Sequence, residues 1–160
     1  MPEPPTPQPS RRIFLRCTAA LAAGAVALRP GAKARATPEA MRQAMREVLG
    51  EAEAHPGKVT LDIPALVENG NAVPLTVSVE SPMSEEDHVK AIHIFNERNP
   101  QPHVISITLG ARAGRAKVAT RIKLADSQQV VAIAEMSDGA FWQGSTDVIV
   151  TLAACVEDLQ

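Results

Sequence analysis

Seven short runs of alternating apolar and polar residues follow one another along this 160-residue chain. They cover residues 59–63, 73–79, 88–95, 103–109, 116–124, 129–136 and 146–153. Turn-forming segments separate them at intervals of about ten residues, and no helical pattern long enough for a crossover lies between them. Strands connected in this way pair antiparallel. The chain is therefore predicted to be all-β, an immunoglobulin-like antiparallel β-sandwich of about seven strands.

One amphipathic helix is expected before these strands, within residues 37–57. Thr37 can cap its first amides and Pro38 suits the first helical position. Apolar side chains then recur at helical spacing, at Met41, Met45, Val48 and Ala52. A Pro-Gly pair at residues 56 and 57 ends the pattern. This leaves residues 58–160 for the β-sandwich domain and its cysteine-bearing tail.

Residues 1–36 have the order of an export signal. A proline-rich leader comes first, then Arg11 and Arg12, an apolar run over 17–28, and the segment AKARA with an Ala-x-Ala cleavage site. The paired arginines indicate the twin-arginine pathway. Twelve apolar positions are fewer than the about 20 that span a bilayer. We therefore expect cleavage after Ala36, release into the periplasm and no membrane attachment afterwards.

The net charge of the chain after residue 36 limits the kinds of partner that can be expected. Six of the 16 Lys and Arg residues and one of the 18 acidic residues lie in residues 1–36, so ten basic and seventeen acidic side chains remain, a net charge of −7. Such a surface argues against nucleic acid and anionic membrane as partners. The twin-arginine pathway carries folded proteins that hold a cofactor or travel with another subunit. Since the sequence has no cofactor motif, a partner subunit is expected.

Motifs for catalysis are missing from the sequence. It has no phosphate-binding glycine loop, no dinucleotide fingerprint and no GxSxG elbow, so no cofactor, metal or catalytic residue is predicted. One alternative is a copper site in which two of His88, His93 and His103 meet across a hairpin, joined by Met83 or Met136. Histidines scattered through strands are more often surface or hydrogen-bonded residues.

Three other side chains are candidates for contacts with a partner or an anion. Arg112 and Arg115 lie in a basic, glycine-containing loop between two strands, which also fits an ordinary polar turn. Trp142 is the single tryptophan of the chain. It either closes one end of the sandwich core or serves as an exposed anchor for another protein.

Cys155 is the one cysteine outside residues 1–36, and it lies just past the last expected strand. The small residues Ala153 and Ala154 before it and the polar residues after it indicate that the chain leaves the sheet there, with an exposed thiol. The thiolate is the reactive form of cysteine, and the nearby Glu157 and Asp158 oppose its formation. A thiol that other proteins must activate is typical of a covalent carrier.

Several segments together resemble the SoxY sulfur-carrier proteins of bacterial thiosulfate oxidation: GKVTLDIPALVENGNAVPLTVSVESPM, VKAIHIFNERNPQPHV, LGARAGRAKVATRIKLADSQQVVAIAEMSDGAFW and VIVTLAAC, in this order. The resemblance implies an immunoglobulin-like sandwich with a leading helix, paired with a SoxZ subunit in the periplasm. It also implies that Cys155 holds sulfur intermediates while a haem c-containing transferase, a thiol hydrolase and a sulfur dehydrogenase act in turn. The carrier itself would be no enzyme and would hold no metal or haem.

The resemblance is weakest beside the cysteine. Well-known SoxY proteins end in Gly-Gly-Cys-Gly-Gly, whereas Ala153, Ala154 and Val156 flank Cys155 here. Alanine restricts the backbone more than glycine does, and valine more again. Two functions therefore stay open: a carrier that transfers sulfur on a less flexible arm, and a binding or adaptor subunit that keeps the heterodimer surface without sulfur transfer.

Overall fold

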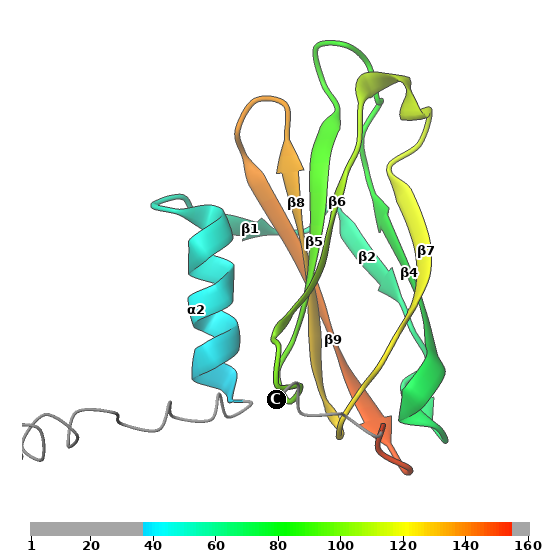
Figure 1. The fold of residues 1–160 in the computed structure, drawn as a ribbon. Helices are drawn as coiled ribbons and strands as arrows, with labels where there is room; N and C mark the ends of the chain where they lie inside the picture. Colours follow the sequence, from blue (N-terminus) through cyan, green and yellow to red (C-terminus); the bar gives the residue numbers. More distant parts are fainter. Residues whose placement is uncertain (1–36, 155–160) are drawn as a thin grey trace, which may run out of the picture. The chain divides into compact units, whose positions relative to one another are not determined.

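Two β-sheets pack face to face in the computed structural model, which describes residues 37–154, and one helix lies on the larger sheet (Figure 1). The larger sheet has the order β1-β9-β8-β5-β6, with β3 also paired to β9, and the smaller sheet has the order β2-β4-β7. The predicted all-β, immunoglobulin-like sandwich with a leading helix is confirmed. The elements are α2 (Pro38–Leu49), β1 (Ala54–Pro56), β2 (Val59–Asp62), β3 (Leu66–Val67), η2 (Gly70–Ala72), β4 (Val73–Val79), β5 (Val89–Asn96), β6 (His103–Thr108), η3 (Ala111–Ala113), β7 (Lys117–Ile122), β8 (Gln128–Met136) and β9 (Phe141–Val150).

The alternating pattern builds the core between the sheets. Every second residue of β4 is buried, from Val73 to Val79, while the residues between them are more exposed. Strand β8 is buried on both faces, because one face joins the core while Val131 and Ile133 on the other lie beneath α2. A continuous apolar run such as that of β8 therefore marks a strand that is covered on both sides.

Helix α2 is shorter than the expected span of residues 37–57. The Thr37 hydroxyl accepts a hydrogen bond from the Ala40 amide (3.1 Å), as predicted for the cap. The helix ends at Leu49 because Gly50 adopts a positive φ of 62° and its amide bonds the Arg46 carbonyl, a glycine-capped terminus. Within residues 37–154 no helix is long and apolar enough to cross a bilayer.

Two short strands that the sequence pattern did not predict extend the larger sheet. Residues 54–56, expected to be the end of the helix, form β1, and residues 66–67 form β3. Both pair with β9, and both pairs are parallel in an otherwise antiparallel structure. Strands of three and two residues are too short to show a period, so the pattern could not reveal them.

Strand β9 begins earlier and ends earlier than the predicted span 146–153. It starts at Phe141, directly after a tight turn in which Gly139 has a φ of 86°. The residues Phe141 and Trp142, expected in a loop, therefore lie in the sheet. At the other end the Thr151 amide bonds the Val67 carbonyl (3.0 Å), and the chain bends away after Val150.

Candidate functional site

The described chain stops one residue short of the candidate carrier cysteine. Cys155 and Val156 lie outside the described residues, as do the arginines of the export signal, Arg11 and Arg12. The geometry that can be examined is therefore that of the residues leading to Cys155. Ala153 is exposed, whereas Ala154 is only 7% exposed.

Three backbone hydrogen bonds hold the chain that leads to Cys155. The Gly70 amide donates to the Leu152 carbonyl (2.8 Å), and the Ala154 amide donates to the Leu124 carbonyl (2.9 Å). The Leu124 amide in turn donates to the Gly70 carbonyl (2.8 Å), which closes the arrangement. We call Gly70, Leu124, Leu152 and Ala154 the arm-base corner. The backbone is thus part of the folded domain up to the residue before Cys155.

Gly70 is the residue that permits this corner. A β-carbon at its position would lie 2.3 Å from the Leu124 carbonyl oxygen and 2.8 Å from the Ala154 nitrogen. No other residue fits without displacing the backbone on both sides. The turn signal around Gly70 is visible in the sequence, but its close approach to residues 54 and 84 positions further on is not.

Three exposed apolar residues lie in or near the arm-base corner. Leu66 is 60% exposed, Ile149 is 59% exposed and Leu152 is 69% exposed. Leu66 and Ile149 are direct partners in the parallel β3–β9 pair, and Leu152 follows in the bend after β9. We call these three residues the arm-base patch. They are three of the four large hydrophobic residues exposed in residues 37–154, the fourth being Ile105 on β6.

Arg112 and Arg115 lie far from the arm-base corner. Both are exposed, in and after η3, which joins one end of β6 to β7. The corner contains Leu124, just past the opposite end of β7, so the whole strand separates the two places (Figure 1). The structure does not bring these arginines together with the residues next to Cys155.

Trp142 is half-buried at the start of β9 and packs against the main core. The Lys58 ammonium lies 4.6 Å from the centre of its ring, and the His55 ring lies 5.6 Å away. A cation over an indole face stabilises both groups. Of the two roles considered for Trp142, the structure favours closure of one end of the core.

Two histidines meet on the outer face of the β5–β6 hairpin. The Nδ1 atom of His93 lies 2.7 Å from the Ser106 hydroxyl, and the Nε2 atom of His103 lies 2.8 Å from the same oxygen. Burial, reinforced by the charge of His103, lowers the pKa of His93, while Glu135 acts in the opposite direction. Two histidines therefore meet across this hairpin, as the alternative copper site would require.

The other residues considered for a copper site, Met83, Met136 and His88, do not lie beside this pair of histidines. Met83 and Met136 are buried between the two sheets, on the opposite face from His93, which neighbours Ile133 beneath α2. His88 is held at the start of β5, where its amide bonds the Ser137 hydroxyl (3.1 Å). Across residues 37–154, no group of three or more His, Cys, Asp and Glu side chains is placed to hold a metal ion.

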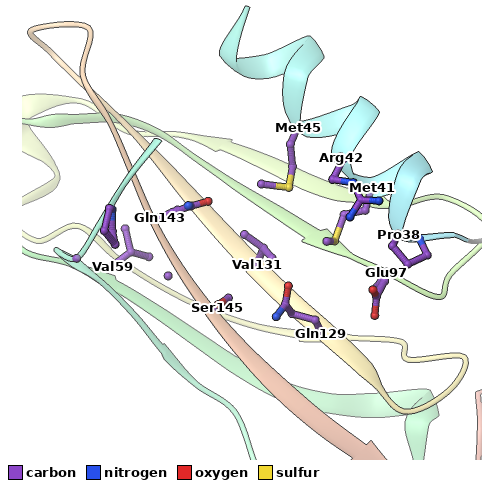
Figure 2. Close-up of a pocket in the computed structure, with 13 residues that line it drawn as sticks. Pro38, Met41, Arg42, Met45, Val59, Glu97, Gln129, Val131, Gln143 and Ser145 are labelled. Atoms are coloured by element: carbon purple, nitrogen blue, oxygen red, sulfur yellow. The ribbon is translucent and has the colours of Figure 1, made fainter. Parts of the chain in front are cut away.

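A groove of about 510 Å³ separates α2 from β9. Figure 2 shows Met41 and Met45 reaching from the helix toward Val131 on the sheet, with Gln143 and Ser145 on the other side. Among residues 37–154, no histidine lines the groove, and neither does any residue of the arm-base corner. It is a gap left where a short helix lies on a broad sheet.

Solved structures share this fold. The chain is similar to the sulfur carrier protein SoxY from Chlorobium limicola f thiosulfatophilum, with a TM-score of 0.60 and 23% identity, covering 71% of this chain and 98% of that one. It is also similar to a superoxide reductase (neelaredoxin) from Ignicoccus hospitalis, with a TM-score of 0.53 and 16% identity, covering 59% and 80% of the two chains. At such identities the likeness establishes the fold.

The sequence itself identifies the family. Residues 45–155 match the family described as Sulfur oxidation protein SoxY, whereas a search of curated proteins gives no match. The matched region runs from within α2 through every strand of both sheets and ends on Cys155. The match therefore includes the arm-base corner and the cysteine that follows it. The chain belongs to the SoxY family of sulfur oxidation proteins.

Proposed function

We propose that this protein is a periplasmic carrier that holds sulfur intermediates covalently on Cys155 during the oxidation of thiosulfate or related sulfur compounds. The observation that carries the proposal is the family match, which extends to residue 155 and so includes the cysteine. Its structural relative from Chlorobium is named a sulfur carrier protein. The twin-arginine sequence features around Arg11 and Arg12 support the periplasmic location.

The carrier chemistry requires partner enzymes. Joining the Cys155 sulfur to the terminal sulfur of thiosulfate forms one S–S bond and releases one proton and two electrons. A haem c-containing transferase is the proposed acceptor of these electrons, and a thiol hydrolase and a sulfur dehydrogenase act on the bound cargo. The acidic residues Glu157 and Asp158 disfavour the thiolate of Cys155. Deprotonation is therefore assigned to the partner enzyme, and the protein itself is no catalyst.

A SoxZ-like subunit is the proposed permanent partner, since SoxY proteins work with SoxZ-type subunits in general. The protein would cross the membrane folded and bring this subunit with it. From residue 37 onward the net charge of −7 makes nucleic acid and anionic lipid poor competitors for its surface.

Mass spectrometry of the intact protein from cells grown on thiosulfate tests the carrier function. We expect mass increments that correspond to added sulfur or thiosulfate, lost on treatment with a thiol reductant and absent from the Cys155→Ser variant. The same spectra give the processed N-terminus and so test cleavage after Ala36. A protein recovered only with a bare thiol under these conditions would contradict the carrier function.

The adaptor function is a second candidate because of the residues around Cys155. Ala154 is bonded into the folded domain, and no glycine flanks the cysteine. An adaptor would need the protein surface but not the thiol. Growth of the Cys155→Ser strain on thiosulfate separates the two functions, since a carrier loses growth at a normal protein level while an adaptor keeps it.

A further inference from the structure

The arm-base patch remains exposed because the backbone around it is fixed. The Ile149 amide donates to the Ala65 carbonyl (2.8 Å) and the Thr151 amide donates to the Val67 carbonyl (3.0 Å). Val67 and Val148, the neighbours that point inward, are 7% and 1% exposed. A slip of one residue would turn these valines outward, so the register that buries them also exposes Leu66 and Ile149.

Acidic side chains border the patch. Asp147 points to the same side of β9 as Ile149, and Glu68 follows β3, where its carbonyl accepts a hydrogen bond from the Thr151 hydroxyl. Asp126 lies next to Ser127, whose hydroxyl bonds the Val150 amide (2.9 Å). All three acidic residues are exposed.

These acidic groups are not neutralised within the described chain. The ion pairs found in residues 37–154 are Arg42 with Glu39 and Lys90 with Glu135, and neither involves the border of the patch. Lys123, next to Leu124 of the arm-base corner, contributes one positive charge. The region therefore combines an apolar centre with an excess of negative charge.

We propose that the arm-base patch is the docking surface for the enzymes that act on Cys155, and that each of them offers an apolar surface bordered by lysine or arginine. The proposal rests on the carrier function proposed above. Apolar centres with complementary charged borders are the ordinary composition of protein interfaces. The tail of this chain is a poor occupant, because Glu157 and Asp158 would be brought beside acidic residues.

The position of the patch fits this role. Cys155 lies three positions after Leu152 in the sequence, and three residues of extended chain span at most about 10 Å. Ala154 is fixed in the arm-base corner, and Ala153 and Val156 restrict the backbone more than glycine would. A cysteine flanked by these residues can reach less far from the domain than one flanked by glycines. The placement of the thiol in an enzyme therefore depends more on where the folded domain docks.

The test uses the mature protein bound to its SoxZ-like subunit and a triple variant, Leu66→Thr, Ile149→Thr and Leu152→Ser. The measured quantity is kcat/KM for loading Cys155 by the purified haem c-containing transferase of the same bacterium, with thiosulfate as donor. We expect a loss of about tenfold or more, as for truncated interface anchors. The matched control is Ile105→Thr, which removes an exposed isoleucine on a distant strand and should leave the rate unchanged.

Three further measurements separate the outcomes. The reaction of Cys155 with a small disulfide reagent should be the same in the variant and the parent, and added salt should slow enzymatic loading of the parent protein. An unchanged loading rate would overturn the proposal. So would dissociation of the SoxZ-like subunit, which would identify the patch as the subunit interface, or faster reaction with the small reagent, which would identify the chain's own tail as the occupant. A parent protein that is never loaded would instead refute the carrier function.

Discussion

The two ends of β9 carry large apolar side chains on the same outer face, but only one end is covered. At the start of the strand, Phe141 packs with the cluster beneath α2. Near the end, Ile149 is 59% exposed and lies beside the equally exposed Leu66. The helix contacts β5 and β6 and packs over Phe95, Val131 and Ile133, and Phe141 is the residue of β9 in that cluster. The helix therefore leaves the far end of β9 uncovered, at the place where the chain continues to Cys155.

This difference shows that Leu66 and Ile149 are exposed because of the fold and not because the strand is poorly packed. Both ends of β9 are anchored on their inner side, Trp142 against the core and Val148 within it. The arm-base corner fixes the backbone beyond the strand as well. An apolar surface held this firmly next to the candidate carrier residue is available for other proteins.

Gly70→Ala should have the largest effect, because it breaks the arm-base corner. The added methyl group would lie 2.3 Å from the Leu124 carbonyl oxygen, so the backbone must shift and the three hydrogen bonds of the corner weaken. We expect a loss of about 3 kcal/mol in the free energy of unfolding, measured in urea. Gly110→Ala is the control, since nothing lies within 4 Å of its β-carbon position. Equal stability of the two variants would show that the corner does not hold the chain.

Trp142→Ala should weaken the covered end of β9. The indole packs against the core and beneath the Lys58 ammonium, and its removal leaves a partly filled space. A loss of about 2 kcal/mol in unfolding free energy is expected, less than for a fully buried tryptophan. Trp142→Phe keeps most of the packing and should recover more than half of that loss. A role for Trp142 as an exposed anchor predicts instead that stability hardly changes.

The free energy of unfolding should also depend on pH, because of His93. Burial and the charge of His103 lower the pKa of His93, so the unfolded chain binds a proton more readily than the folded one. The contribution of His93 to the free energy of unfolding is therefore fully present above its unfolded pKa of about 6.5. It is lost as the pH falls through the lower pKa that His93 has in the folded protein. Thermal unfolding between about pH 7 and about pH 5 measures this slope.

His93→Gln should flatten that slope, and His103→Gln should reduce it, since His103 is the second cause of the shift. Glu135, paired with Lys90, acts against both and remains in each variant. A slope that is identical in the parent and in His93→Gln would assign the pH dependence to other groups.

Ile149→Thr should have the smallest effect on stability, within about 0.5 kcal/mol, because the side chain is largely in water already. Phe141→Thr, on the same face of the same strand, is the matched comparison and should cost about 2 kcal/mol through loss of the cluster beneath α2. Urea unfolding of both variants makes the comparison direct. A large loss for Ile149→Thr would mean that the arm-base patch is covered in solution.

Much of the fold was predictable from local pattern. The alternation in 73–79 and 116–124 predicted strands that the structure confirms as β4 and β7, and the cap at Thr37 marked the start of α2. The predicted helix ran too far along the chain, because the helix ends at Gly50, whose positive φ caps it after Leu49. The span of β9 was wrong at both ends, because its limits depend on a turn at Gly139 and on bonds to β3.

The candidate site was predictable only in part. Cys155 stood out in the sequence as the one cysteine outside residues 1–36, and the family match includes it. Arg112 and Arg115 were candidates for contact with a partner or an anion, and the length of β7 separates them from the arm-base corner. Trp142 appeared beside a turn and turned out to be part of the sheet.

The sequence by itself determined the class of fold, the position of the helix start and the identity of the single candidate carrier residue, because periodicity, capping and residue type are local properties. Tertiary structure decided what surrounds that residue. Leu66 and Ile149 are 83 positions apart and Gly70 and Ala154 are 84 apart, so only the pairing of β3 with β9 and the hydrogen bonds of the corner bring them together. Such contacts depend on the register of distant strands, and no short stretch of sequence records it.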